Sequence, residues 1–290
     1  MKPTPTWNRA ALLQSPLFAP LHPVLADFHV AGFPTLADYN ALLAARQPAI
    51  EAQSGAKIRF VPQECGRLPF ERQYEPRCYL QGEVPTRSDN WHDLLNALVW
   101  LAYPLTKAAI NARHYQALIQ AADSSSQRGA VRDVNTLLDE SGVIVPYADH
   151  QSGNELAGLL RDFKWKELFW QHREQMRPHS AQQEMDFYIF GHGLYEKALQ
   201  PYVGMTGQGL LLAVEPAFFG WSQVKRLAHL DTLLAKHLAA PEHCRHTRDL
   251  SPVPLLGVPS WTADNENSAY YDNTAYFRAG RRASTLPTHD

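Results

Sequence analysis

A run of apolar residues from Leu94 to Tyr103 predicts the most deeply buried helix of the chain, because its apolar side chains would cover nearly the whole helical circumference. The residues at 88–90 (S-D-N) are all favourable helix N-caps, and Asp93 places a carboxylate in the first turn. We therefore expect a helix that begins at Trp91 and lies at the centre of the core.

Pro104 interrupts this pattern, since proline lacks the backbone donor and disfavours helical geometry at the preceding Tyr103. The helix should kink or break there and a second helix should follow over 105–121. One face of that helix would carry polar side chains at helical spacing, namely Lys107, Asn111 and His114.

Weaker periodic patterns predict the remaining elements. They comprise helices at 36–46, 154–170, 186–199 and 222–240, a strand at 57–62, and a β-hairpin whose strands, 136–138 and 143–145, flank a turn at 139–142. Beyond Leu250 neither period persists, which predicts an irregular C-terminal arm rich in proline and aromatic residues. The expected fold is mainly α, of the α+β class: one domain over 1–290, with a peripheral N-terminal arm (1–20) and tail (279–290).

Composition and charge argue against several classes of binding partner and cellular location. The 290 residues carry a formal net charge of −2, which gives no general attraction to nucleic acid or to anionic lipid. Prolines, glycines and polar residues interrupt the two uncharged stretches, 10–26 and 198–214, so neither predicts a signal sequence or a membrane span. Three cysteines without a C-x-x-C motif imply no disulfide framework and favour the cytoplasm.

His192 and Glu196 stand at i and i+4, so that on a helix they can converge on one metal ion or one substrate. Gly191 and Gly193 on either side of the histidine would allow another backbone or a ligand to approach closely. The alternative is a surface ion pair that stabilises a helix by about 0.3 kcal/mol.

His92 and Asp93 lie in the first turn of the apolar helix, where the helix dipole favours a carboxylate and a neutral imidazole. Asn96 is one turn further on the same face. The alternative is that these residues only cap the helix and form buried hydrogen bonds. His114 follows His92 by 22 positions, which a continuous helix would span in about 33 Å, so we expect Lys107 and His114 to lie elsewhere.

Asp139 and Glu140 place two carboxylates at the tip of the expected hairpin, either as turn residues or as groups for metal binding or proton transfer. Arg132 and Asp133, shortly before them, could pair with each other or close a site.

Two other clusters are weaker candidates. The histidines and cysteine of H-x5-H-C-x-H provide no second ligand pair for structural zinc, and G-M-T-G-Q-G at 204–209 follows no obvious strand, as a phosphate loop would. The first cluster consists of His237, His243, Cys244 and His246. The established nucleotide, protease and hydrolase motifs are absent.

Four blocks of sequence resemble a bacterial family catalogued as domain of unknown function 3025. The blocks are the long segment 86–114 (T-R-S-D-N-W-H-D-L-L-N to N-A-R-H), T-L-L-D-E-S-G at 136–142, F-G-H-G-L-Y-E-K-A-L-Q-P-Y-V-G at 190–204, and L-G-V-P-S-W with the following N-E and Y-Y-D at 256–272. The resemblance covers about residues 20–278 and implies no activity. It places the polar candidates of these blocks inside family motifs and leaves the H-C-x-H cluster outside them.

These observations lead to one hypothesis and two alternatives. The hypothesis is a metal-assisted hydrolase that acts on a small molecule, in which a divalent ion is held by some of His92, Asp139, His192 and Glu196. Glu140 or Asp93 would transfer protons, and Asn96 would complete the catalytic group. The alternatives are a non-catalytic binding or scaffold protein, in which the same residues are caps and buried partners, and a histidine–metal nuclease that uses His92, Asn96, Asn111 and His114.

Overall fold

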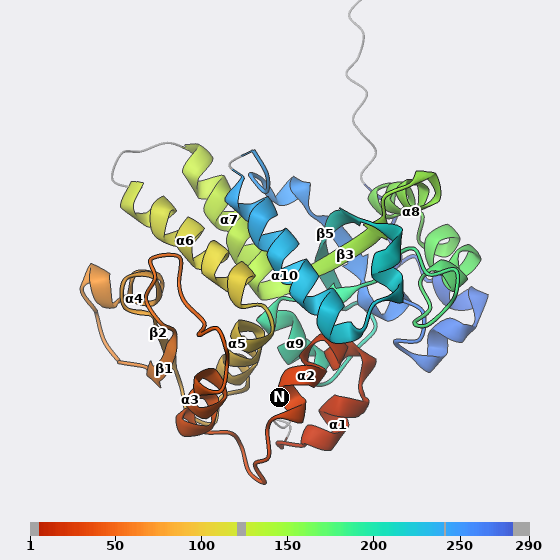
Figure 1. Ribbon diagram of the computed structural model, residues 1–290. Coiled ribbons are helices and arrows are strands. Elements are labelled where there is room, and N and C mark those ends of the chain that lie inside the picture. The colour runs from red at the N-terminus through yellow and green to blue at the C-terminus, as the bar shows by residue number, and fades with distance from the viewer. Residues whose placement is uncertain (1–5, 121–125, 241, 281–290) are drawn as a thin grey trace, which may run out of the picture.

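The computed structural model describes residues 6–120, 126–240 and 242–280 and shows an α+β fold with two small sheets (Figure 1). The α-helices are α1 (Arg9–Gln14), α2 (His22–Ala26), α3 (Leu36–Ala44), α4 (Tyr74–Gln81), α5 (Trp91–Ala102), α6 (Pro104–Gln120), α7 (Ser126–Ser141), α8 (Gln151–Arg161), α9 (His192–Ala198) and α10 (Gln223–Ala239). The helices expected at 36–46 and 222–240 are confirmed as α3 and α10.

The strands form two separate sheets. In the smaller one, β1 (Arg59–Pro62) pairs in parallel with β2 (Glu83–Thr86), so the strand expected at 57–62 is confirmed. The larger sheet has the order β4-β3-β5-β6, from β3 (Gly142–Ala148), β4 (Tyr188–Ile189), β5 (Thr206–Val214) and β6 (Ser251–Pro254). Its central pair, β3 and β5, is parallel, and β3 is buried along its whole length. Such burial on both faces explains the continuous apolar run of this strand.

Helix α5 begins at Trp91 and is buried at every position from Asp93 to Leu101, as the apolar run predicts. The Asn90 side chain caps it by accepting the backbone N–H of Asp93 at 3.0 Å. The chain then breaks at Tyr103, and α6 starts at Pro104 in a new direction (Figure 1).

Asp231 of α10 holds the start of α6 in place. Its carboxylate accepts the backbone N–H groups of Leu105 at 3.0 Å and Thr106 at 2.8 Å, and the Thr106 hydroxyl donates to the Asp231 carbonyl. These are the orphan donors at the N-terminus of a helix, which need an acceptor when buried. Because α6 packs against both α7 and α10, this cap fixes the position of the polar face of α6.

The β-hairpin expected at 136–145 was wrong. Residues 136–141 are the last turns of α7, and the chain passes directly from Ser141 into β3 at Gly142. Val134 and Leu138 are fully buried one turn apart, so the helical period holds up to the junction. The close fit there requires glycine, since a Cβ on Gly142 would collide with the Leu138 carbonyl.

Two further expectations need correction. The segment at 186–199 begins as strand β4, and only its second half is helical, as α9. The helix expected at 154–170 ends at Arg161, and a π-helical turn follows at Glu167–Gln171.

The chain ends are more tightly packed than their patterns suggest. The C-terminal arm contributes strand β6 and then runs as short 3-10 turns, where the Tyr276 hydroxyl donates to the Met205 carbonyl at 2.8 Å. Near the N-terminus, Leu17 and Phe18 are buried, and the Phe18 ring contacts Tyr195 of α9. Residues 281–290 of the expected tail lie outside the described part of the chain.

Two simpler expectations can be compared directly. All three cysteines are unpaired. Within the described residues, none of the helices has the length and apolar character needed to cross a membrane.

Candidate metal site and its cavity

The ends of three helices meet at one point. The start of α5, the end of α7 and the start of α9 come together because α9 packs against both α5 and α7. The backbone N–H groups of Phe190 and Gly191 both donate to the Gly142 carbonyl at 2.9 Å, which ties the start of α9 to the end of α7. A Cβ on Gly191 would collide with the Ser141 and Gly142 backbone, so the close approach expected beside His192 is present.

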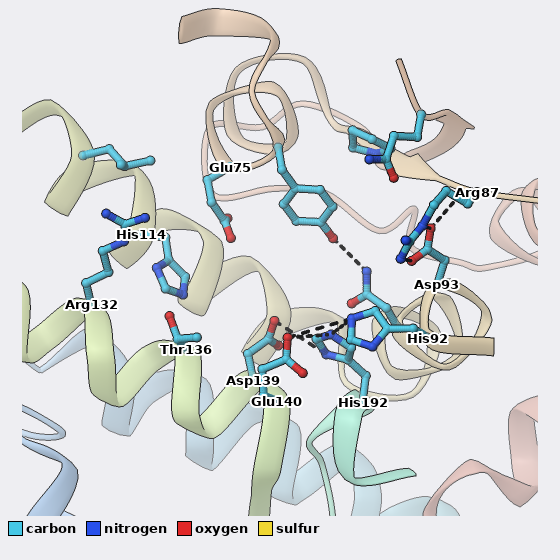
Figure 2. Close-up of a pocket in the computed structure, with 15 residues that line it drawn as sticks. Glu75, Arg87, His92, Asp93, His114, Arg132, Thr136, Asp139, Glu140 and His192 are labelled. Carbon is cyan, nitrogen blue, oxygen red and sulfur yellow. Dashed lines mark hydrogen bonds and ion pairs between the residues drawn. The ribbon is translucent and has the colours of Figure 1, made fainter. Parts of the chain in front are cut away.

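Two histidines and one carboxylate converge at this junction (Figure 2). The Nε2 atoms of His92 and His192 are 3.0 Å apart. The Glu140 Oε1 atom lies 3.5 Å from the His192 Nε2 atom and 3.9 Å from that of His92. The His192 side chain is 7% exposed and the His92 side chain 32% exposed, so the group lies at the wall of the protein and can be reached from solvent.

A second carboxylate faces the far nitrogen of each imidazole. The His92 Nδ1 atom is 3.0 Å from Glu196 Oε2, and the His192 Nδ1 atom is 3.7 Å from Asp139 Oδ2. Asp139 also pairs with the buried ammonium of Lys107, at 2.5 Å. Histidines that bind metals usually have such a carboxylate or carbonyl acceptor behind them, because it fixes the ring orientation and the tautomer.

The position of the hydrogen on each imidazole decides whether its Nε2 atom can bind a metal ion. With a hydrogen on each Nδ1, bonded to Glu196 at His92 but without a hydrogen-bond partner among the described residues at His192, both Nε2 atoms turn lone pairs toward each other across 3.0 Å. Two acceptors at that separation repel unless a cation or a shared proton lies between or beside them. With the anionic Glu140 adjacent, the three groups form a ligand set suited to a divalent ion.

Two of these carboxylates, Asp139 and Glu140, are held in their charged form. Burial alone would raise the pKa of Asp139, but the Lys107 ammonium outweighs it and lowers that pKa. The adjacent His192 imidazole, with a smaller contribution from His92, lowers the pKa of Glu140 against an opposing effect of burial. Gly193 of α9 makes room for Glu140, because a Cβ there would collide with the Glu140 carboxylate.

The converging groups lie in the wall of a cavity of about 310 Å³ (Figure 2). This volume suits a small molecule rather than a polymer. Most of the residues that line it have polar side chains. They are Gln63, Tyr74, Glu75, Pro85, Arg87, His92, Asp93, Asn96, His114, Leu118, Arg132, Thr136, Asp139, Glu140 and His192.

Asp93 and Asn96, expected to be catalytic, line this cavity but are engaged in other contacts. The Arg87 guanidinium contacts both Asp93 carboxylate oxygens, at 2.7 and 2.9 Å, and its backbone N–H adds a third bond of 2.6 Å. The Asn96 amide donates to the Tyr74 hydroxyl at 2.7 Å, whereas its buried Oδ1 atom has no partner in the described chain. These two side chains therefore shape the cavity beside the converging group.

The separation expected between His92 and the polar face of α6 was wrong. The break at Tyr103 turns α6 back alongside the site, so that Lys107 reaches Asp139 and His114 lines the same cavity as His92. Asn111 also faces this region, since its amide donates to Glu75 at 2.6 Å.

Glu75 was not singled out from the sequence. It lies on α4, points into the cavity and accepts the hydrogen bond from Asn111 (Figure 2). Burial raises its pKa to about 7, so it can hold or release a proton near neutral pH. No motif surrounds it, and only the packing of α4 against α6 reveals its position.

The weaker candidates form no comparable site. The rings of His237 and His243 stack at 4.0 Å, and burial raises the pKa of Cys244 to about 11. Among the residues that the structure describes, the only group of three or more His, Cys, Asp or Glu side chains close enough to hold a metal is the one at His92, Glu140 and His192. The glycine-rich segment at 204–209 leads into β5 instead of forming a loop before a helix.

Comparison with known proteins gives one match. Residues 58–281 match a family described as "Protein of unknown function (DUF3025)", which confirms the resemblance found in the sequence blocks. No curated protein and no solved structure matches the chain.

Proposed function

The chain belongs to the DUF3025 family, and from its geometry we propose that it is a divalent-metal-dependent hydrolase whose ion is held by His92, His192 and Glu140. One observation carries this proposal: the two imidazole Nε2 atoms face each other at 3.0 Å while each Nδ1 atom faces a carboxylate. Such a pair of lone pairs beside a carboxylate is best satisfied by a metal ion.

The proposed roles differ from those expected at Asp139 and Glu196. These carboxylates orient His192 and His92 from behind, and Glu140 becomes the third ligand. Three protein ligands leave at least one position open for water or substrate, as in catalytic zinc sites. When bound, a divalent ion supplies Lewis acidity and lowers the pKa of the water that it binds.

Glu75 is the proposed group for proton transfer. It lines the same cavity, and its pKa of about 7 suits a general acid or base at neutral pH. The Asp93 carboxylate is occupied by the guanidinium and the backbone N–H of Arg87, so we do not assign it this role. The hydrogen bond from Asn111 keeps the Glu75 carboxyl directed into the cavity.

The donor set alone would also suit ferrous iron in an oxygen-dependent enzyme. Glu75 favours hydrolysis, because activating water requires a proton acceptor near neutral pH whereas binding dioxygen does not. Turnover that requires dioxygen would replace the hydrolase by an oxygenase at the same ligands.

The proposal is tested on the full-length chain after its metals are removed with a chelator and zinc, manganese, cobalt or ferrous iron is added back. Esters, amides and phosphoesters of small acids serve as substrates. We expect hydrolysis that returns with metal in the wild type and in a His237→Ala control, and that is absent in His192→Ala. A protein that binds metal but hydrolyses none of these classes, or one that binds none while remaining folded, would support the non-catalytic alternative.

A further inference from the structure

We infer that the substrate carries an anionic group, a carboxylate or a phosphate, which binds at the end of the cavity formed by Arg132, His114 and Thr136. This inference rests on the proposed function, since it places the bond to be hydrolysed at His92, His192 and Glu140. It adds the chemical class of the substrate and the residues that select it.

The two ends of the cavity lie along one face of α7. Arg132, Thr136 and Glu140 are spaced by four residues each, so they share this face, and Arg132 is separated from Glu140 by about 12 Å of helix. His114 reaches the Arg132 end from α6. Figure 2 shows Arg132, His114 and Thr136 grouped together, away from the group formed by Glu140 and the two other histidines.

The exposed Arg132 differs from Arg87, which also lines the cavity, and from the buried Lys107, because no described residue neutralises it. Arg87 pairs with Asp93, and Lys107 pairs with Asp139. Arg132 makes no hydrogen bond or ion pair with any residue that the structure describes. Burial is the largest influence on the pKa of both Glu75 and His114, and the Arg132 charge adds a smaller effect through space that favours the ionised Glu75 and the neutral His114. A guanidinium with unused donors, facing a cavity, is suited to binding a carboxylate or phosphate with two parallel hydrogen bonds.

The neighbours of Arg132 add donors without adding an opposing charge. His114 is buried, makes no hydrogen bond within the described chain, and remains neutral because burial lowers its pKa to about 4. A neutral imidazole still has one N–H group to donate. The exposed Thr136 hydroxyl, which has no hydrogen-bond partner among the described residues, is a further donor on the same face of α7.

Two carboxylates are coupled to this end of the cavity through space: Asp139, which is paired with Lys107, acts on His114, and Arg132 acts on Glu75. The pKa of Glu75, about 7, lies close to neutral pH, so Glu75 adds at most a partial negative charge to this wall. Arg132 is therefore the unpaired charge that a ligand anion meets at this end.

The test uses zinc-loaded full-length protein and linear dicarboxylates from malonate to suberate, each compared with the monocarboxylate of the same length. One carboxylate represents the acid product at the metal, and the other probes the Arg132 end. We expect the longer dicarboxylates to bind about tenfold or more tightly than their matched monocarboxylates. This advantage should disappear in Arg132→Gln and persist in Arg161→Gln, which removes an exposed charge of α8 outside the cavity. Carboxylates with a terminal phosphonate show which anion is preferred.

The outcomes separate this inference from the proposed metal function. Equal affinity for the two series, or an advantage that survives in Arg132→Gln, overturns the anion subsite even if zinc binds normally. If zinc does not bind, the metal function fails, and the subsite is judged from inorganic phosphate binding to the metal-free protein. That binding must depend on Arg132 and not on Arg161, and its absence overturns the subsite as well.

Discussion

For single residues, the orientation of each imidazole depends on the carboxylate that faces its Nδ1 atom. Glu196 contacts the Nδ1 atom of His92 at 3.0 Å but is not one of the three proposed metal ligands. Glu196→Gln should therefore lower metal affinity by about 10- to 100-fold while the fold is kept, because a neutral acceptor orients the ring less firmly. Competition titration with a chromogenic chelator measures this. Glu167→Gln, an exposed change elsewhere, is the control, and equal affinities in both variants would contradict the role of Glu196.

Glu75 predicts how stability changes with pH. Burial raises its pKa in the folded state to about 7, above the ordinary value of 4.5, so its contribution to stability is full below pH 4.5 and is lost as the pH rises through 7. At pH 8 the free energy of unfolding of Glu75→Gln should consequently exceed that of the wild type by as much as about 3 kcal/mol. This difference should shrink toward pH 5.

This comparison is made by urea unfolding of both proteins in the presence of chelator, so that metal binding does not contribute. The Gln side chain can still accept the hydrogen bond from Asn111, which keeps the packing comparable. A stability difference that is constant between pH 5 and pH 8 would show that Glu75 titrates normally.

Most residues of the site could be singled out from the sequence, whereas the residues that they contact could not. His92, His192 and Glu140 stood out because ionisable groups beside apolar runs need an explanation. Glu75 carries no such local signal, since it acquires its shifted pKa from burial. Arg132 was expected to pair with Asp133 or to close a site, and the sequence did not show that it would lack a partner in the described chain. Both properties arise from packing between segments far apart in the sequence.

Among the elements, the break between α5 and α6 brings Lys107 and His114 to the site. Asp231 stabilises the chain at this break by capping the start of α6. Asp231→Ala removes the acceptor of two buried backbone N–H groups, at Leu105 and Thr106. We expect a loss of about 2 kcal/mol in the free energy of unfolding, in the upper range for a helix cap because the donors are left without water. Urea unfolding measures the loss, with the exposed Asp162→Ala as control. An equal effect of both changes would mean that α6 is held by packing alone.

The start of α9 predicts a change that affects the site more than the fold. A Cβ on Gly193 would collide with the Glu140 carboxylate, which can move, rather than with a fixed backbone. Gly193→Ala should therefore weaken metal binding by about tenfold or more while the circular dichroism spectrum stays that of the wild type. Gly158→Ala on α8, where a Cβ would meet nothing, is the matched control. Undiminished affinity in Gly193→Ala would exclude Glu140 as a ligand.

The elements with sustained periodicity were predictable, and those that depend on a junction were not. Capping and burial located α5, and the proline located its end. The segment 136–145 was mistaken for a hairpin because two short apolar runs on either side of D-E-S-G have the composition of strands and a turn. What decides the outcome is the packing of Val134 and Leu138 beneath the sheet, together with a glycine that lets the helix continue into the strand without a loop.

At the scale of the whole molecule, the expected α+β class and the family were correct, and the site is assembled from segments separated by about 50 residues each. Composition and charge predicted no attraction to nucleic acid or anionic lipid, and the site lies in the wall of a cavity of about 310 Å³. The separation between α5 and α6 could not be judged from helix length alone, because a single break reversed the direction of the chain.

The central claim is that His92, His192 and Glu140 together hold a divalent ion. The most direct test is elemental analysis of the full-length protein, purified without an affinity tag or chelator, beside His192→Ala and the His237→Ala control. The account predicts an equimolar transition metal in the wild type and in the control, and its loss from a folded His192→Ala protein. Metal absent from all three proteins, with no change in thermal unfolding on addition of zinc, manganese or ferrous iron, would contradict it.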